Sequence, residues 1–410
     1  MSAVSPARRA AFDVVRRVFE DGAWADRALR GAAAGLDERD RALAQRLAYG
    51  TVQRARTLDH AIEMLARRPV ARVDPPVLAA LRLGAYQLGY LDGVPRYAAV
   101  NESVELVKVA GAHRAVGFAN AVLRRVADGI VPLLAALPQA TPAEAALLHS
   151  YPDWVAETWC RDLGLDGALA LMRAQNEPAE LAVRLVRGEI EGRPDIEVPG
   201  AWLVDRLDEA AVDEGRIWPQ SRGSQLVGHV VGSRDGERVL DLCAAPGGKA
   251  TMLAGQVVAV DVSETRVREL EANVRRLRAT NVQVVQADGR DLPPELTGFD
   301  RALVDAPCSG LGVLAARPDL RWRSAQLPEL QLELLLAAVA RVRPGGVVVY
   351  SVCTVNADEC EAVVDGSGLE TLPLGSEWPR FAHPSRPEFL QTLPHLHGTS
   401  GFFVARLRVP

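Results

Sequence analysis

The chain has 410 residues, of which 48% are hydrophobic, 24% charged and 5% aromatic. The length predicts more than one domain, and the composition excludes a globally disordered chain, a collagen-like chain and a small disulfide scaffold. Of the 47 basic residues only Lys108 and Lys249 are lysines, which leaves 45 arginines. A lysine retained in such a chain is a candidate for a position that arginine does not fill well.

The net charge of −5 hides an asymmetry along the chain. Residues 1–130 hold 20 basic and 14 acidic side chains, a net charge of +6, and the remaining residues carry −11. A basic front part joined to an acidic body indicates a partner that carries phosphates, such as a nucleic acid. The alternative is that the arginines of the front part are solvated helix faces without a partner. Charge alone does not decide between the two.

Residues 1–130 are predicted to be all-helical. Apolar side chains recur at helical spacing over residues 12–19, and the arginines mostly lie off that stripe. Further helices are predicted over 75–91 and 100–126, the latter ending in an arginine pair that suits a helix C-terminus. We expect a compact helical bundle here. Residues 131–230 are then expected to form a proline-containing linker and a small mixed α/β subdomain.

The pattern changes after residue 230 to short apolar runs, which read as buried strands. The runs cover residues 239–242, 257–260, 282–285, 302–304 and 347–350. Helical stretches over 264–278 and 327–341 lie between some of them. Alternating strands and helices predict a parallel, doubly wound sheet with helices on both faces. Residues 231–410 are therefore predicted to form an α/β domain.

A glycine-rich loop follows the first of these strands. It consists of Cys243, Ala244, Ala245, Pro246, Gly247, Gly248 and Lys249. Glycines between a strand and a helix let the backbone approach a ligand at the carboxyl end of a sheet, but this loop lacks the spacing of a Walker A or dinucleotide motif. Asp261 ends the next strand, where a carboxylate is placed to bind ribose hydroxyls. The two features predict a nucleoside cofactor without a bound pyrophosphate.

Three further polar positions follow the later strands. Asp288 comes after the third strand and either accepts a hydrogen bond from an adenine amine or is only a turn residue. Asp305 ends the fourth strand and leads into the Pro-Cys sequence that contains Cys308, and Cys353 follows the fifth strand. Because the carboxyl ends of parallel strands lie at one edge of the sheet, we expect both thiols to lie beside Asp305.

The five cysteines do not form a recognisable framework. No pair has C-x-x-C spacing and no histidine cluster joins them, so no metal site is predicted. Reduced thiols indicate a cytoplasmic protein, and Cys160 and Cys360 are expected to be inert core residues.

No uncharged apolar stretch of ~20 residues occurs, so no membrane span is predicted. We expect the protein to be a monomer.

Three motifs in order carry a family resemblance. They are LDLCAAPGGK over 240–249, LVDAPCSGLGV over 303–313, and SVCT followed by Asp-Glu over 351–359. Together they resemble the RNA (cytosine-5) methyltransferases of the Sun family. The helical front part resembles the NusB-like RNA-binding domain that distinguishes the bacterial 16S rRNA enzymes of this family (Fmu/Sun type). The resemblance covers essentially the whole chain.

This resemblance implies a class I, Rossmann-like methyltransferase domain, S-adenosylmethionine as the cofactor and 16S rRNA as the partner. It also implies a set of residues that line the cofactor: Cys243, Ala244, Ala245, Pro246, Gly247, Gly248, Lys249, Asp261, Arg266, Asp288 and Asp305. The single lysine of the loop, Lys249, would lie at the methionine end of the cofactor, where a slender ammonium can reach a carboxylate.

The resemblance also assigns the catalytic roles. A thiolate that adds to C6 of cytosine turns C5 into a carbon able to attack a sulfonium methyl group. The family pattern implies that this thiolate is Cys353, that Cys308 helps to remove the C5 proton or to release the product, and that Asp305 hydrogen-bonds the base. The residues alone do not distinguish the two cysteines, because DNA enzymes use the cysteine of a Pro-Cys motif as nucleophile.

Two other functions remain open from the sequence. A DNA cytosine-5 methyltransferase would explain the Pro-Cys motif, but not the second cysteine or the NusB-like front part. A non-catalytic RNA-binding or antitermination factor would explain the front part, but not the intact Cys308, Cys353 and Asp305.

Two stretches depart from the family pattern. Residues 221–225 and 397–401 lack acidic residues that the family tends to carry there. Beyond the Pro-Cys loop, Arg317, Arg321 and Arg323 are predicted either to bind RNA phosphates or to be ordinary surface charge.

Overall fold

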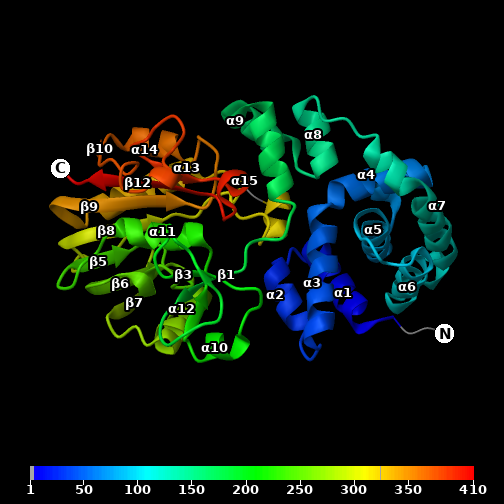
Figure 1. Ribbon diagram of the computed structural model, residues 1–410, viewed down its shortest axis with the longest axis horizontal. Helices are drawn as coiled ribbons and strands as arrows, with labels where there is room; N and C mark the ends of the chain where they lie inside the picture. The colour runs from blue at the N-terminus through cyan, green and yellow to red at the C-terminus, as the bar shows by residue number, and fades with distance from the viewer. Residues whose placement is uncertain (1–3, 324) are drawn as a thin grey trace. The chain divides into compact units, whose positions relative to one another are not determined.

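The computed structural model describes residues 4–323 and 325–410, which form two compact units (Figure 1). Unit 1 contains the chain up to Asn176 together with Leu314–Arg323, and unit 2 contains Glu177–Val313 and the chain from Ala325 onward. The boundary at Asn176 divides the segment that the sequence assigns to a linker and a small subdomain.

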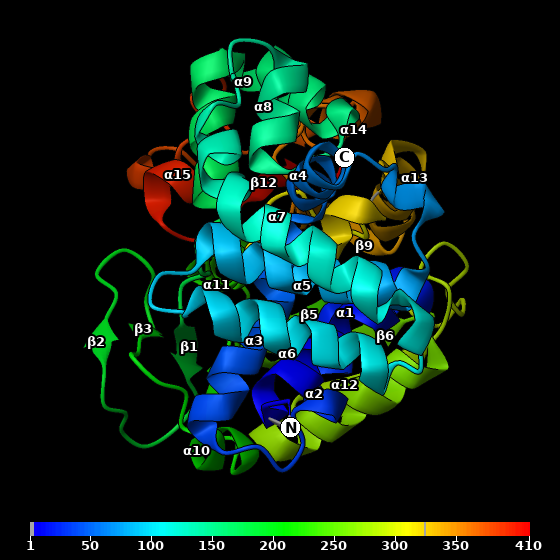
Figure 2. The same cartoon turned by 90° about the vertical axis from the view of Figure 1, so that its right-hand side faces the viewer.

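Unit 1 is helical, as predicted for the front part of the chain. Its helices are α1 (Pro6–Glu20), α2 (Ala25–Ala32), α3 (Glu38–Gln53), α4 (Ala55–Ala66), η1 (Val70–Arg72), α5 (Pro75–Tyr90), α6 (Arg96–Val109), η2 (His113–Ala115), α7 (Val116–Ala135), α8 (Pro142–His149), α9 (Asp153–Ala174) and η4 (Pro318–Trp322). The apolar stripe of α1 buries Phe12 and Val15 in a core shared with Leu47 of α3 and Leu83 of α5. Figure 2 shows α5, α6 and α7 lying side by side in this bundle.

The prediction of a single helix over 100–126 is wrong. α6 ends at Val109, and Gly111 follows with φ of +78°, a left-handed conformation that glycine adopts without steric cost. α7 then runs past the arginine pair to Ala135, so these arginines do not end a helix.

The segment that follows the Pro-Cys loop belongs to the core of unit 1. Arg321 is only 1% exposed, and its guanidinium donates to the carbonyl oxygens of Gln53 (2.9 Å) and Ser150 (3.0 Å) and to Oδ1 of Asn176 (3.1 Å). It also lies 4.2 Å from the ring centroid of Tyr151. Neutral oxygens and an aromatic face compensate the charge of this buried guanidinium, although its Nε has no hydrogen-bond partner among the described residues.

The other arginines of this segment are also bound within unit 1. Arg323 donates to the carbonyl oxygen of Ala23 (2.6 Å), and its guanidinium lies over the Trp24 ring at 4.6 Å. Arg317 lies over the same ring at 5.3 Å. The prediction that the three arginines bind RNA phosphates is therefore wrong for Arg321. Its guanidinium is buried and hydrogen-bonded to carbonyl oxygens of unit 1.

Unit 2 contains two β-sheets and the helices that cover them. Its elements are β1 (Ala182–Leu185), β2 (Arg193–Pro194), β3 (Ala201–Leu203), α10 (Glu209–Asp213), β4 (Ile217–Pro219), α11 (Arg222–Val231), β5 (Arg238–Asp241), η3 (Ala250–Met252), β6 (Gln256–Asp261), α12 (Glu264–Leu277), β7 (Val282–Gln286), β8 (Phe299–Asp305), α13 (Pro328–Val339), β9 (Val342–Val352), α14 (Glu361–Ser367), β10 (Glu370–Thr371), η5 (Pro379–Phe381), β11 (Leu390–Thr392), α15 (Pro394–His397) and β12 (Phe402–Arg408). The small sheet is antiparallel with the order β2-β3-β1-β4. The large sheet has the order β10-β12-β9-β8-β5-β6-β7, and β11 pairs with β12.

Five strands of the large sheet are parallel, as predicted: β9, β8, β5, β6 and β7. Successive residues of each strand face opposite sides, so that Leu240 packs in a core with α13 and α14, whereas Val239 packs in a core with α11 and α12. Helices thus cover both faces (Figure 1). This explains why the strands read as continuous apolar runs.

One edge of the large sheet is antiparallel, which the prediction of a parallel sheet did not include. β12 pairs antiparallel with β9, and β10 and β11 pair antiparallel with β12. β12 was missed because its arginines interrupt the apolar run, although most of its residues are buried.

The strand order reverses between β5 and β8. From β5 the chain adds β6 and β7 on one side, then crosses to add β8 and β9 on the other side. Ligands of such sheets bind beyond the carboxyl ends of the strands at this point. Asp241 ends β5 and Asp305 ends β8, so the sheet order places both carboxylates at the expected site.

The buried Arg321 predicts a large effect on stability. Arg321→Met leaves three buried oxygens without their donor, and we expect the free energy of unfolding to fall by ~3 kcal/mol. Arg9→Met is the control, because Arg9 is half exposed and its ion pair with Asp13 is a surface contact, for which we expect a change within ~0.5 kcal/mol. Urea unfolding followed by circular dichroism measures both, and equal effects would contradict the anchoring role.

Candidate active site

The two thiols predicted to lie at one edge of the sheet face each other. The Sγ atoms of Cys308 and Cys353 are 3.4 Å apart, and both cysteines are free thiols. Cys353 directly follows β9 and Cys308 lies just beyond β8, and these strands are hydrogen-bonded neighbours. Parallel pairing of β8 with β9 therefore brings together two residues that are far apart in the sequence.

The two thiols have different acidities. The hydrogen bond with Cys353, together with burial, raises the pKa of Cys308 well above its ordinary value. The same hydrogen bond lowers the pKa of Cys353, and the nearby Lys249 ammonium acts in the same direction, while burial and the charge of Asp305 oppose it. Cys353 is therefore the more acidic thiol of the pair and the candidate nucleophile, because the thiolate is the nucleophilic form of cysteine.

Lys249 and Asp305 form an ion pair next to the thiols. The Lys249 Nζ lies 2.6 Å from Oδ2 of Asp305, and the Ser351 hydroxyl donates to Oδ1 of the same carboxylate at 2.7 Å. The ammonium also lies 5.0 Å from the ring centroid of Phe402. The lysine of the loop thus pairs with a carboxylate of the protein, and its place at the methionine end of the cofactor stays a prediction.

The glycines of the loop are required by packing. Gly247 has φ of +103°, and a Cβ atom there would come within 2.7 Å of Leu270; a Cβ at Gly248 would come within 2.8 Å of the Trp218 indole nitrogen. The α-helix expected after the loop is only the short 3-10 helix η3. The loop is therefore shaped by tight backbone packing more than by a helix start.

Asp261 and Arg266 hold the middle of the loop. Asp261 is buried, accepts from the backbone N–H of Ser263 (3.1 Å) and lies 3.4 Å from the backbone nitrogen of Ala245. Arg266 pairs with Asp261 at 3.3 Å and donates to the carbonyl oxygen of Ala245 at 2.9 Å. A further bond runs from the Asn273 amide to the carbonyl oxygen of Pro246 (2.9 Å).

Asp241 is a candidate site residue to which the sequence assigned no role. It is 1% exposed and has no hydrogen bond to another side chain within the described residues. Burial, aided by the charge of Asp305, raises its pKa to about 7. Its position at the end of β5, beside a glycine loop, was the signal available in the sequence.

Asp288 lies after β7, as predicted, but it binds Arg290. Its carboxylate pairs with the Arg290 guanidinium at 2.7 Å and accepts from the Arg290 backbone N–H at 2.9 Å. These hydrogen bonds lower the pKa of Asp288 to about 2. The backbone bond is typical of an aspartate in a turn. A bond to an adenine amine therefore stays a prediction.

The residues at the carboxyl ends of β5, β6 and β8 fit a nucleoside cofactor bearing a charged methionine part. Asp241 is a buried carboxylate without a side-chain partner, and the glycine loop leaves no room for side chains over the backbone. Asp261 is placed for ribose hydroxyls. The Lys249–Asp305 pair offers one charge of each sign to the amino-acid part.

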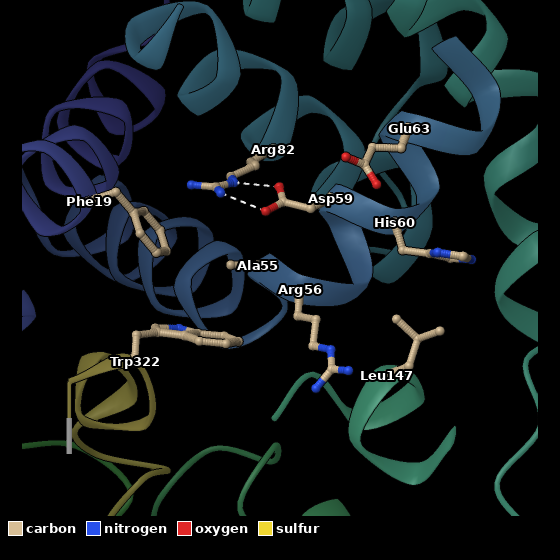
Figure 3. A pocket seen from close by; sticks show the side chains of 9 residues that line it. All are labelled: Phe19, Ala55, Arg56, Asp59, His60, Glu63, Arg82, Leu147 and Trp322. Atoms are coloured by element: carbon tan, nitrogen blue, oxygen red, sulfur yellow. Dashed lines mark hydrogen bonds and ion pairs between the residues drawn. The ribbon is translucent and has the colours of Figure 1, made fainter. Parts of the chain in front are cut away.

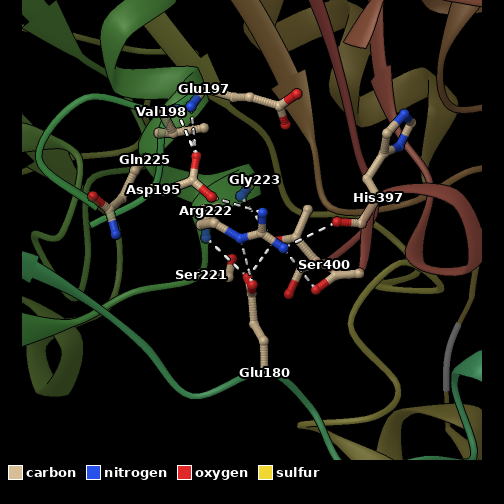
Figure 4. Close-up of polar contacts among 12 residues, drawn as sticks. Glu180, Asp195, Glu197, Val198, Ser221, Arg222, Gly223, Gln225, His397 and Ser400 are labelled. Carbon is tan, nitrogen blue, oxygen red and sulfur yellow. Dashed lines mark hydrogen bonds and ion pairs between the residues drawn. The ribbon is translucent and has the colours of Figure 1, made fainter. Parts of the chain in front are cut away.

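The two stretches that depart from the family pattern lie against each other (Figure 4). Arg222 donates to the carbonyl oxygen of His397 at 2.9 Å, and its side chain, 11% exposed, pairs with Glu180 (2.7 Å) and Asp195 (2.9 Å). The backbone N–H of Gly223 donates to the Thr399 hydroxyl. Acidic side chains from elsewhere in unit 2 therefore surround an arginine where the two stretches meet.

The Pro-Cys loop is held to the end of the second departing stretch by backbone contact. Gly312 donates to the carbonyl oxygen of Cys353 (3.0 Å), and Gly401 donates to the carbonyl oxygen of Gly312 (2.7 Å). A Cβ atom at Gly312 would lie 2.1 Å from the Gly401 oxygen. Both glycines are needed for this approach, which sets the position of the loop that carries Cys308.

Within residues 4–323 and 325–410, no group of three or more histidine, cysteine, aspartate or glutamate side chains is arranged to hold a metal ion. In the same residues no helix is both long and apolar enough to cross a membrane.

Comparison with known proteins agrees with this geometry. The model of the 16S rRNA methyltransferase RsmB/F family matches residues 229–408, and the NusB family model matches residues 5–128. A relative from Mycobacterium tuberculosis, named as a methyltransferase, is 39% identical, covering 99% of this chain and 97% of its own. The ribosomal RNA small subunit methyltransferase B of Thermus thermophilus is 38% identical over 83% of this chain and 80% of its own.

The chain belongs to the RsmB/F methyltransferase family. The predicted family, the Rossmann-like methyltransferase fold, the NusB-like front domain and S-adenosylmethionine as cofactor are thereby confirmed. The solved structure of the protein PH0851 shares the fold, with a TM-score of 0.80, 23% identity and 99% coverage of both chains. S-Adenosylmethionine supplies the methyl group when bound, and the loop 243–249 with Asp261 and Asp305 are the residues expected to hold it.

Asp241 predicts a pH effect on stability. Its pKa is about 7 in the folded chain against an ordinary 3.8. At pH values between the two, the folded chain still holds this proton, whereas the unfolded chain has lost it. Stability therefore falls as pH rises from about 4 to about 7, and Asp241→Asn, which does not ionise, removes this loss. We expect the cofactor-free variant to match wild type near pH 4 and to exceed it by ~2–4 kcal/mol near pH 8.

Urea unfolding at a series of pH values measures this difference. Asp288→Asn is the control, because Asp288 is a partly exposed carboxylate whose pKa is lowered by Arg290. Its loss should leave the slope between pH 5 and 8 unchanged. A wild-type slope in Asp241→Asn would contradict the assignment.

Proposed function

We propose that this enzyme methylates C5 of a cytosine in 16S rRNA through a covalent bond between Cys353 and C6. The observation that carries the proposal is the thiol pair, 3.4 Å apart and next to the Lys249–Asp305 ion pair. Cytosine C5 is a weak nucleophile, and addition of a thiolate at C6 makes it reactive. The relatives named as small subunit rRNA methyltransferases support 16S rRNA as the substrate.

The residues act in a defined order. Cys353, whose pKa is lowered by its hydrogen bond from Cys308, adds as a thiolate to C6. Asp305 hydrogen-bonds the base at N3 or its amino group, and Lys249 holds the Asp305 carboxylate in place. After C5 has taken the methyl group, a base accepts the C5 proton, the electron pair of that C–H bond restores the C5–C6 double bond, and the bond from sulfur to C6 breaks so that Cys353 leaves as a thiolate. Cys308 assists this release.

The substrate base must leave a base-paired stack to reach the thiols. C5 and C6 are shielded inside a duplex, so the target cytosine is single-stranded or flipped out. DNA as the substrate is disfavoured because the front of the chain matches the NusB family, and a non-catalytic factor is disfavoured because the thiol pair and Asp305 are assembled.

Two cysteine substitutions test the chemistry. Cys353→Ala should abolish methyl transfer to 16S rRNA and form no covalent adduct. Cys308→Ala should accumulate an RNA–protein adduct that survives denaturing gel electrophoresis, because release is blocked after addition. Cys160→Ala is the control, since this thiol lies in α9 of unit 1, and it should methylate like wild type. An adduct that needs Cys308 and forms without Cys353 would reverse the assignment.

We further propose that a basic hollow of unit 1 binds the phosphates of the RNA. A hollow of about 580 Å³ is lined by Arg68, Arg72, His113, Arg114 and Phe118, among others. The arginines are exposed, and none of the three forms an ion pair within the part of the chain that the structure describes. Arg68 lies 5.2 Å from the centroid of the Phe118 ring, an aromatic face on which a base can also stack.

A second hollow of about 450 Å³ in unit 1 is a useful contrast (Figure 3). Its basic side chains are neutralised: Arg82 forms a double hydrogen bond with Asp59, and Arg56 pairs with Asp153. Figure 3 shows the Arg82–Asp59 pair among the residues that line this space. Paired charges offer little to a phosphate, so the first hollow is the better candidate for RNA.

Salt dependence of binding tests the basic hollow. Replacing Arg68, Arg72 and Arg114 with Gln should weaken binding of the full chain to 16S rRNA fragments and reduce the slope of log affinity against log salt by about two, since each single-strand phosphate contact contributes about 0.7. Arg9, Arg268 and Arg275 replaced with Gln form the control, because each is exposed and paired with an acid one helical turn away. Equal slopes for both triple variants would reject this surface.

A further inference from the structure

Glu359 is fully buried between the two cysteine loops. Its carboxylate accepts hydrogen bonds from the backbone N–H of Ser309 (3.0 Å), the backbone N–H of Leu327 (3.1 Å), the side-chain amide of Gln331 (2.8 Å), the side-chain amide of Asn356 (2.7 Å) and the Ser309 hydroxyl. It pairs with no lysine, arginine or histidine among the described residues. Such a cluster of donors suits an ionised carboxylate, which only accepts.

The contacts of this carboxylate bridge the residues that follow each thiol. Ser309 comes directly after Cys308, and Asn356 lies in the loop that follows Cys353, just before a turn over 357–360. The hydroxyls of Ser309 and Thr354 are 2.9 Å apart, and the Asn356 amide also reaches the Thr354 hydroxyl at 2.9 Å. The strand pairing sets where each loop starts, and this network sets how the two loops approach beyond the strands.

The charge of Glu359 acts unequally on the two thiols. It adds to the hydrogen bond and burial that raise the pKa of Cys308. The charged groups that act on Cys353 are Asp305, which raises its pKa, and Lys249, which lowers its pKa. Tyr350 also faces the network, donating its hydroxyl to the Glu359 carbonyl oxygen at 2.7 Å, and the adjacent Cys360 is buried there with it.

We propose that Glu359 is a positioning residue: its buried carboxylate ties the loop after Cys308 to the loop after Cys353 and brings a negative charge close to Cys308. The inference rests on the proposed function, in which Cys353 attacks as a thiolate and Cys308 acts at release. Glu359 itself touches neither substrate nor cofactor in this role.

Two substitutions separate the charge from the geometry. Glu359→Gln keeps the size and removes the charge, so the midpoint of Cys308 alkylation by iodoacetamide, followed by mass spectrometry between pH 6 and 11, should move down by about one pH unit. Glu359→Asp keeps the charge but shortens the side chain, so the alkylation profile should stay and kcat for methyl transfer should fall about tenfold or more, with KM for RNA unchanged.

Glu361→Gln is the matched control. This neighbouring carboxylate pairs with His383 at 2.7 Å and forms no hydrogen bond with either cysteine loop among the described residues, so both the alkylation profile and kcat should stay at wild-type values. If Glu359→Gln does not fold, as judged by circular dichroism, Ser309→Ala replaces it. That variant removes one donor and no charge, so kcat should fall while KM and the alkylation profile stay.

The inference is overturned if folded Glu359→Gln keeps the wild-type alkylation profile and kcat, or if Ser309→Ala keeps the wild-type kcat. Alkylation is measured on the full chain without RNA. A wild-type protein that fails to methylate cytosine would therefore refute the proposed function, whereas the alkylation profiles would still decide whether the charge of Glu359 acts on Cys308.

Discussion

The pairing of β8 with β9 is the constraint on which the site depends. In this parallel register Asp305 lies opposite Ser351, and the two strands end together. The Ser351 hydroxyl can then bind Asp305, and the residues that follow each strand bring Cys308 and Cys353 within 3.4 Å. A one-residue slip would turn every side chain of a strand to the other face and would move Asp305 away from Ser351, so the site depends on this register.

Two kinds of contact set the positions of the two cysteine loops beyond the ends of the strands. Close backbone approach at Gly312 and Gly401 leaves no room for side chains and fixes the loop that carries Cys308. Hydrogen bonds to the buried Glu359 then join this loop to the loop after Cys353. Charge works with this geometry, because the Lys249 ammonium lowers the pKa of Cys353 whereas the Glu359 carboxylate raises the pKa of Cys308.

Arginine has several different roles in this chain, which explains why its abundance says little by itself. Arg321 is buried among carbonyl oxygens, and Arg222 lies between two carboxylates. Arg68 and Arg72, in contrast, are exposed and line a hollow in which one carboxylate, Asp74, is present. Only tertiary contacts separate an arginine available to a phosphate from one already satisfied by the protein.

The sequence by itself determined the helical front part, the five parallel strands and the order of the motifs, because periodicity and local turn residues depend on neighbours along the chain. It also indicated that Cys308 and Cys353 would meet beside Asp305, since the ends of parallel strands share one edge. The tertiary structure alone decided the antiparallel edge at β12 and the burial of Arg321. It also decided the partners of Lys249 and Glu359, because these depend on which distant backbone and side-chain groups the fold brings into reach.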